Sequence, residues 1–291
     1  MKPVKPLHNY HLLPTFHVSR IHISDASLKK EGLGSLRDKE PQAKCENDVD
    51  VRAAAAMCQY AYSKLSPGVN PKTDLIDGWE RMKENEVNKL IGSGFYNKLQ
   101  NRSNGFSSML FQKQADGVQY YAYCTVGTDE KIDWVDNGTQ WLTGFARQYS
   151  YSVNMAKQID RAIGNKAVLW FIGHSLGGGL ASNNSLVTGR HAITFNAAGL
   201  NMLRVGATLL LNNWKDLFHP IKRTQRVHAF VVEGEALSSF YKLCLLLGVP
   251  YLYQPAYGDQ KTIKLKQNGI GLITKHSMTT ILDHLGMKYY Y

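Results

Sequence analysis

The stretch KAVLWFIGHSLGGGL, residues 166–180, decides how the chain folds. It begins with a near-continuous apolar run, which is typical of a strand buried on both faces of a sheet. Gly173 and Gly177 stand on either side of Ser175 and sterically allow a sharp turn there. A glycine-rich helix is expected directly after Ser175. The stretch therefore predicts a buried strand, a strained turn that presents a serine, and a helix that packs closely on the strand.

Strand and helix patterns alternate on both sides of this stretch. Strands are expected at residues 107–112, 118–127, 191–196 and 226–232, and helices at 48–65, 141–164 and 176–189, with short helices around 75–99. Such alternation indicates a mostly parallel central sheet flanked by helices. We therefore predict an α/β fold of the α/β-hydrolase type, with a nucleophile elbow at Gly173–Gly177.

Length and composition set the limits of this fold. A chain of 291 residues can bury one large core, or one domain plus a modest extension. Residues 1–47 show no clean periodicity and several prolines, so we expect a loosely structured N-terminal extension followed by the domain at 48–291. The N-terminus lacks the continuous apolar segment of a Sec signal, and no stretch has the ~20 apolar residues of a membrane span. We expect a cytoplasmic protein, or one exported by a specialised secretion system.

The chain is basic, with a formal net charge of +11. A positive surface attracts anionic partners such as phospholipid membranes or nucleic acid, but it can also be an ordinary solvated surface. No nucleic-acid-binding motif accompanies the charge, so no nucleic-acid partner is expected. The four cysteines form no CxxC pair and are expected to be mostly buried thiols. The histidines form no metal-ligand motif, and we expect no metal and no cofactor.

GHSLGG at residues 173–178, followed by ITFNAAGL at 193–200, resembles the class 3 lipases and related bacterial phospholipase A1-type proteins, including lipase toxins. The resemblance extends roughly from Val49 to Leu285. It implies a serine hydrolase in which Ser175 attacks a carboxylic ester. It also implies that the backbone N–H of Leu176 binds the oxyanion that forms.

A second oxyanion donor is expected at the end of the strand 118–127. Thr125-Val126-Gly127-Thr128, followed by Asp133-Trp134 and Asn137, resembles the GT…DW…N stretch of the same family. The matching residue for the second donor is Thr128. Val126 is a departure, because an arginine is common at its position in the family.

The catalytic base and acid should follow the serine along the chain, because the triad of this fold runs Ser, acid, His. His276 stands immediately before a terminal helix that Ser277 starts, and it resembles the family's histidine. His191 and His228 fall in strands and His284 falls late in the helix, which makes them weaker candidates.

The acid is expected just after the strand 226–232. Glu235 occupies the matching position, although the family usually has an aspartate there. Glu233 is the nearest alternative, followed by Asp216 and Asp259.

Two apolar segments point to a lipid substrate. Trp141, Leu142 and Phe145 follow the oxyanion stretch, where related lipases carry a lid, and residues 236–257 form a second apolar segment. Either segment can line an acyl groove, contact a membrane surface or pack in the core. We expect a phospholipase A of the A1 type that acts on phospholipid at a membrane surface, with an immunity protein as partner if it is a toxin effector. The alternatives are an esterase or thioesterase on smaller acyl substrates, or a catalytically silent hydrolase fold that only binds.

Overall fold

The computed structural model describes residues 49–65, 75–76, 78–101, 105–127, 138–200, 224–246, 255–265 and 270–287. The expected extension at 1–47 and the proposed oxyanion residue Thr128 lie outside these residues. So do the alternative acid Asp216 and the side chains of Trp141, Leu142 and Phe145 in the lid prediction. Within the described part of the chain, no helix is long and apolar enough to cross a bilayer.

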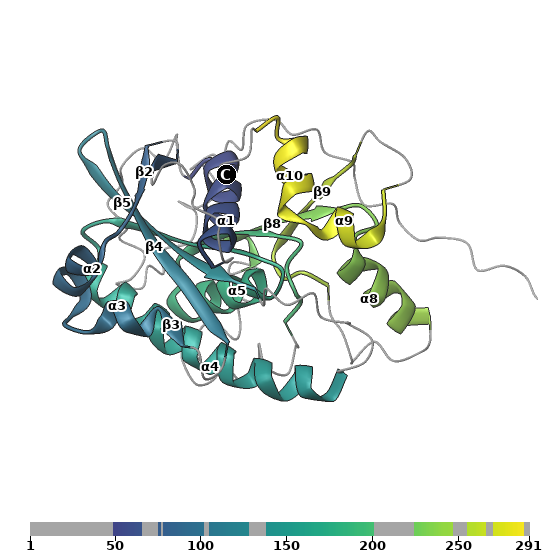
Figure 1. The fold of residues 1–291 in the computed structure, drawn as a ribbon, viewed down its shortest axis with the longest axis horizontal. Coiled ribbons are helices and arrows are strands. Elements are labelled where there is room, and N and C mark those ends of the chain that lie inside the picture. The colour runs from purple at the N-terminus through teal and green to yellow at the C-terminus, as the bar shows by residue number, and fades with distance from the viewer. Residues whose placement is uncertain are drawn as a thin grey trace, which may run out of the picture. The chain divides into compact units, whose positions relative to one another are not determined.

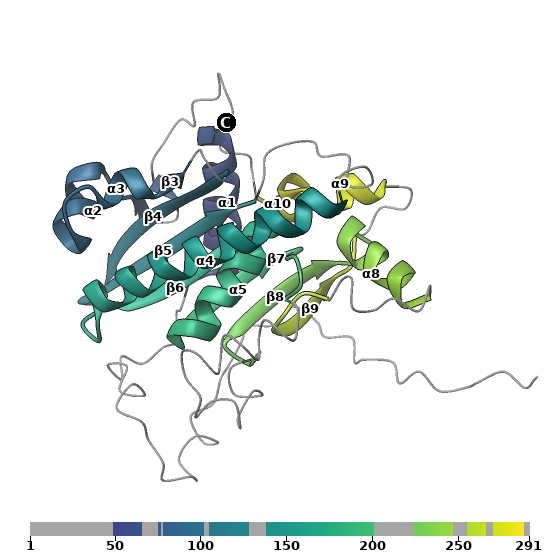
Figure 2. The same ribbon diagram turned by 90° about the horizontal axis from the view of Figure 1, so that it is seen from below.

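One sheet of nine strands forms the centre of this region (Figures 1 and 2). Its strands are β1(Leu75–Ile76), β2(Trp79–Arg81), β3(Gln100–Asn101), β4(Phe106–Ala115), β5(Val118–Val126), β6(Val168–His174), β7(His191–Phe195), β8(Val227–Val232) and β9(Asp259–Ile263). The order is β1-β2-β4-β5-β6-β7-β8-β9, with β3 also paired to β4. Neighbours from β5 to β9 are parallel, whereas β1 to β4 extend the sheet with antiparallel pairs. Together with the flanking helices, this arrangement confirms the predicted α/β fold.

A tight hairpin joins the antiparallel part to the parallel part. Asp116 and Gly117 connect β4 to β5 with φ angles of 51° and 76°. Positive φ at both central residues is the hairpin turn whose twist matches that of the strands, and Asp-Gly is a favoured pair for it. The expected hairpin over residues 107–127 is therefore present, and its register pairs Ala115 with Val118.

Helices cover both faces of the sheet. Their bounds are α1(Val51–Leu65), α2(Glu84–Ile91), α3(Phe95–Lys98), α4(Gly138–Ile163), α5(Leu176–Thr188), α8(Ala236–Leu246), α9(Leu272–His276) and α10(Met278–His284). The apolar side chains of α1 and α10 pack with Trp170, Ile172 and Ile193 on one face of the sheet. The helices α4 and α5 lie on the other face (Figure 2), where their apolar side chains form a cluster with Leu169 and Phe171.

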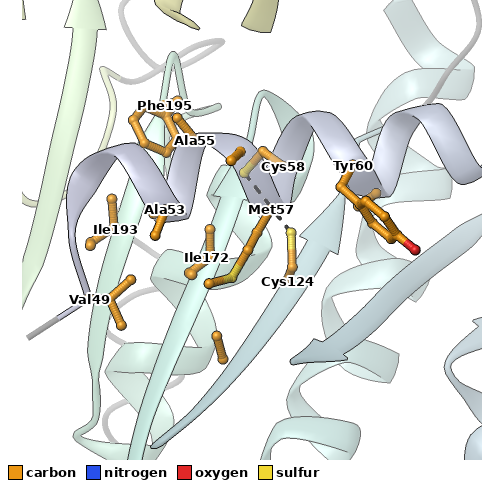
Figure 3. Packing of buried hydrophobic residues seen from close by; sticks show 14 of the residues in the cluster. Val49, Ala53, Ala55, Met57, Cys58, Tyr60, Cys124, Ile172, Ile193 and Phe195 are labelled. Atoms are coloured by element: carbon orange, nitrogen blue, oxygen red, sulfur yellow. Dashed lines mark hydrogen bonds between the residues drawn. The ribbon is translucent and has the colours of Figure 1, made fainter. Parts of the chain in front are cut away.

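The alanine run of α1 brings this helix close to β5 and β6. Ala54, Ala55 and Ala56 are fully buried, and their short side chains allow a close approach to the sheet (Figure 3). Cys58 of α1 lies with its Sγ 4.0 Å from the Sγ of Cys124 on β5, and both are buried free thiols. The helix thereby reaches the carboxyl ends of β5 and β6.

Three details differ from the sequence interpretation. The region 75–99, expected to hold only short helices, also contains β1 and β2. The strand β9 was not expected at all. His276, expected in a loop before the terminal helix, is the last residue of the short helix α9.

Candidate active site

The backbone at Ser175 makes a strained turn between β6 and α5. Ser175 has φ 57° and ψ −127°, a conformation that residues with a side chain rarely adopt. Its N–H donates to the carbonyl of Phe195 at 3.0 Å, and its own carbonyl accepts from the N–H of Ala198 at 2.9 Å. The start of the loop after β7 therefore holds the turn in place, with the serine side chain at the carboxyl edge of the sheet.

Gly173 and Gly177 make this turn possible, because neighbouring backbone atoms occupy the space that a side chain at either position would need. A Cβ added to Gly173 would collide with the carbonyl of Gly177, and one added to Gly177 would collide with the carbonyl of Thr125. The Thr125 hydroxyl also donates to the Gly177 carbonyl at 2.7 Å. The amino end of α5 is thus pressed against the end of β5, as the sequence pattern predicted for a close helix–strand contact.

Ser175, His276 and Glu235 form a line of hydrogen bonds. The Oγ of Ser175 lies 2.9 Å from Nε2 of His276, and Nδ1 of His276 lies 2.7 Å from Oε2 of Glu235. Ser175 and His276 are each 9% exposed, whereas Glu235 is 1% exposed. Since a carboxylate only accepts, His276 carries its proton on Nδ1, and Nε2 is left to accept the serine hydroxyl proton. This tautomer is the one that a general base next to a serine requires.

Glu235 is held at the amino end of α8. Oε2 accepts from the backbone N–H of Leu237 at 2.8 Å, and Oε1 accepts from the N–H of Ser238. Burial raises the pKa of the Glu235 carboxyl, but the hydrogen bonds from His276, Ser238 and Leu237 outweigh it and hold the pKa below its ordinary value. Glu235 is therefore an anion beside the imidazole at neutral pH.

The alternative acids and bases lie elsewhere, as far as the structure describes them. Glu233 is exposed, although only Gly234, with φ 69°, separates it from Glu235. Asp259 is exposed on the edge strand β9, and His284 is exposed near the end of α10. Of the candidate acids within the described residues, Glu235 is the one that forms a hydrogen bond with His276.

His191 and His228 lie near the amino ends of β7 and β8, away from Ser175. Their rings stack at 6.2 Å between centroids, and each lies over Trp170. Burial lowers the pKa of both to about 4, with added repulsion from Arg226 at His191 and from Lys261 at His228.

Leu176 is the first residue of α5, so its backbone N–H has no acceptor inside the helix. The helix dipole also favours negative charge at this end. Gly127, the last described residue after β5, lies beside it: a Cβ on Gly127 would be 3.4 Å from the Leu176 nitrogen. The amino end of α5 thus places the backbone N–H of Leu176 next to Ser175.

Sequence reasoning missed three residues that support His276: Asn196 and His174 contact its backbone carbonyl, and Tyr62 contacts His174. Asn196, with φ 41°, accepts the N–H of Val232 at 2.8 Å and donates to the His276 carbonyl at 3.0 Å. His174 donates to the same carbonyl, and Tyr62 contacts His174. The sequence placed His174 and Asn196 at strand ends, but nothing in the sequence connected Tyr62 to them.

The described residues contain no group of three histidine, cysteine or acidic side chains that could hold a metal ion.

Comparison with known proteins places the chain among phospholipase-like sequences. Residues 53–273 match a phospholipase-like family model described as the Tle-like phospholipase domain. A stretch of 104 residues is 38% identical to an extracellular phospholipase A1 of Serratia liquefaciens and covers 35% of this chain. The matched stretch spans 30% of the length of that curated relative.

Proposed function

The chain belongs to the Tle-like phospholipase domain family, and we propose that it hydrolyses a carboxylic ester bond of phospholipids with Ser175 as the nucleophile. The observation that carries this proposal is the pair of short contacts from Ser175 to His276 and from His276 to Glu235. They occur on a serine held in a strained turn at the carboxyl edge of a parallel sheet. A serine with only a structural role would require neither the strained backbone nor the hydrogen bond to a histidine–carboxylate pair.

In the first step, Oγ of Ser175 attacks the ester carbonyl while Nε2 of His276 takes the hydroxyl proton. Glu235 stabilises the imidazolium that forms and holds its ring in place. The N–H of Leu176 and a donor from Thr128 bind the oxyanion. His276 then gives the proton to the leaving oxygen, the lysophospholipid departs, and the acyl group remains on Ser175.

In the second step, water replaces the lysophospholipid. His276 takes a proton from this water, the hydroxide attacks the acyl ester, and the proton returns to Oγ of Ser175 as the fatty acid leaves. The same residues therefore serve both steps, and the cycle uses no metal and no cofactor.

We propose that the enzyme works at a membrane surface. Leu272 and Ile273 of α9 are 52% and 76% exposed, although both are large apolar residues, and they stand just before His276 in the chain. Leu246, at the end of α8, is 84% exposed. α8 packs against α9 (Figure 1). Exposed apolar side chains on α8 and α9, together with a net charge of +11, suit an anionic lipid surface.

The finer proposals come from the relatives. The name of the Serratia liquefaciens protein supports cleavage at the sn-1 position and action outside the cell. An exported phospholipase that attacks membranes of other cells needs an inhibitor in the producing cell, so an immunity protein is the partner we propose.

Mass spectrometry of vesicle products tests this function directly. Vesicles of mixed phosphatidylethanolamine and phosphatidylglycerol, with different acyl chains at sn-1 and sn-2, should yield a lysophospholipid and the sn-1 fatty acid. Ser175→Ala should lose this activity by several orders of magnitude and lose labelling by a fluorophosphonate probe, with an unchanged melting temperature. Turnover of short soluble esters alone would instead identify an esterase, and the absence of label and turnover in the wild type would identify a binding protein.

A further inference from the structure

A second row of hydrogen bonds lies behind the site and does not include Ser175. It starts at the backbone N–H of Gly127, which donates to Oη of Tyr62 at 3.2 Å. Oη of Tyr62 lies 3.0 Å from Nδ1 of His174, and Nε2 of His174 lies 2.7 Å from the carbonyl oxygen of His276. The row connects the end of β5 to the main chain of the proposed base by way of α1 and β6.

The direction of each bond follows from the chemistry of the groups. A carbonyl only accepts, so Nε2 of His174 must carry a proton. Burial, together with the nearby His276, lowers the pKa of His174 to about 3, so the ring is neutral at pH 7. Nδ1 then has no proton, and the Tyr62 hydroxyl must donate to it. Every polar atom of the His174 ring is thereby used.

The fit around Tyr62 is tight. A Cβ on Gly127 would lie 2.7 Å from the Tyr62 oxygen, so only glycine allows the hydroxyl to sit there. The tyrosine ring meets the His174 ring edge-on, with 5.6 Å between centroids. One hydroxyl therefore touches both the strand that leads to the expected oxyanion residue and the ring next to Ser175.

The His276 carbonyl needs such support because its helix is short. α9 has 5 residues and ends at His276, so this carbonyl has no partner in a further helical turn. His174 from β6 and Asn196 from the end of β7 both donate to it, at 2.7 and 3.0 Å. Two donors on neighbouring strands fix the position of the His276 backbone, and hence where its ring meets Ser175 and Glu235.

The neutral state of His174 also suits the reaction. Its ring lies 4.9 Å from the ring of His276, centroid to centroid. When His276 takes the serine proton, a second imidazolium at this distance would repel it. A ring whose two nitrogens are occupied by Tyr62 and the carbonyl stays neutral and leaves the proton on His276.

We propose that Tyr62 and His174 are positioning residues for the proposed hydrolysis: together they hold the His276 main chain so that its imidazole stays between Ser175 and Glu235. This inference rests on the proposed function. Removing the Tyr62 hydroxyl leaves Nδ1 of His174 without a donor and the Gly127 N–H without an acceptor. The His276 ring then samples positions away from the serine, and misplacement by about 1 Å can cost up to 10²-fold in rate.

The test compares Tyr62→Phe with Tyr151→Phe. The control removes a tyrosine hydroxyl that donates to the Lys98 carbonyl at 2.9 Å and does not belong to the row of Gly127, Tyr62 and His174. With a soluble p-nitrophenyl ester, Tyr62→Phe should lower kcat about tenfold with little change in KM, and fluorophosphonate labelling should slow equally. Tyr151→Phe should change none of these.

His174→Gln provides a second measurement, since the glutamine amide can donate to the His276 carbonyl but cannot accept from Tyr62 in the same way. It should retain more activity than His174→Leu, which donates nothing. Wild-type kcat and an unchanged rate of fluorophosphonate labelling in folded Tyr62→Phe overturn the inference while leaving the proposed function intact. A wild type that neither turns over the ester nor takes the label removes the proposed function itself.

Discussion

Replacing Glu235 by glutamine is the sharpest perturbation of the proposed mechanism, because the carboxylate has three donors and the amide can satisfy them only in part. Oε2 accepts from His276 at 2.7 Å and from Leu237 at 2.8 Å, while Oε1 accepts from Ser238. With the amide oxygen at the Oε2 position, the amide NH₂ faces the Ser238 N–H. With the oxygen at the Oε1 position, the NH₂ faces the Leu237 N–H and donates to His276, which holds the wrong tautomer.

Both orientations lower the rate of hydrolysis, and both cost stability. In the first orientation, the neutral amide no longer stabilises the imidazolium with a negative charge. In the second, the wrong tautomer cannot take the serine proton. An equivalent amide substitution in a serine protease lowered kcat by about 10⁴. A buried N–H that faces another donor costs about 1–3 kcal/mol, so the melting temperature should fall measurably. Glu235→Asp keeps the charge and shortens the side chain by one carbon, about 1.5 Å. It should lose roughly 10² or less in kcat.

The assay is kcat for a soluble ester, measured together with thermal melting for Glu235→Gln, Glu235→Asp and Glu233→Gln. Glu233 is exposed and two residues away, which makes it the matched control. The expected order of activity is wild type and Glu233→Gln, then Glu235→Asp, then Glu235→Gln. Near-normal turnover in Glu235→Gln with collapse in Glu233→Gln would refute this reading of the site and assign the acid to Glu233.

Two further predictions concern stability and membranes. Because burial lowers the pKa of His174 to about 3 and of His191 and His228 to about 4, these rings stay neutral in the folded chain while the unfolded chain protonates them below pH 6.5. The free energy of unfolding should therefore fall as the pH drops from 6.5 towards 4, by up to about 1.4 kcal/mol per pH unit for each histidine. Urea unfolding at pH 7, 6 and 5 measures this change, and a free energy of unfolding that stays constant over this range would contradict the prediction. Binding to phosphatidylglycerol vesicles should weaken with salt and with Ile273→Asp, whereas equal binding to neutral vesicles would exclude a role for the net charge.

The parts of the fold that the sequence predicted well are those set by local pattern. The apolar run before Ser175 and the glycines around it specify β6, the turn and α5 almost without tertiary information. The Asp116-Gly117 turn specifies the β4–β5 hairpin for the same reason. The two residues of β1 are too few to show a period, and β9, with the sequence DQKTI, is too polar to show an apolar pattern. Their pairing partners decide both strands. The helix α9 was missed because a single turn has no helical period either.

The residues of the candidate site also fall into those that a local motif predicts and those that only the tertiary structure brings together. The motif and the resemblance proposed Ser175, His276 and Glu235, and the structure brings these side chains within hydrogen-bonding distance. The chain could not reveal what holds His276, because Tyr62 is 112 residues from His174, and Asn196 is 80 residues from the carbonyl it contacts. Parallel strands explain how they meet: the ends of β5, β6, β7 and β8 share one edge, so residues at those ends become neighbours whatever their separation. The nucleophile can thus be predicted from one segment of sequence, whereas the residues that hold the catalytic base in place can be identified only from the assembled sheet.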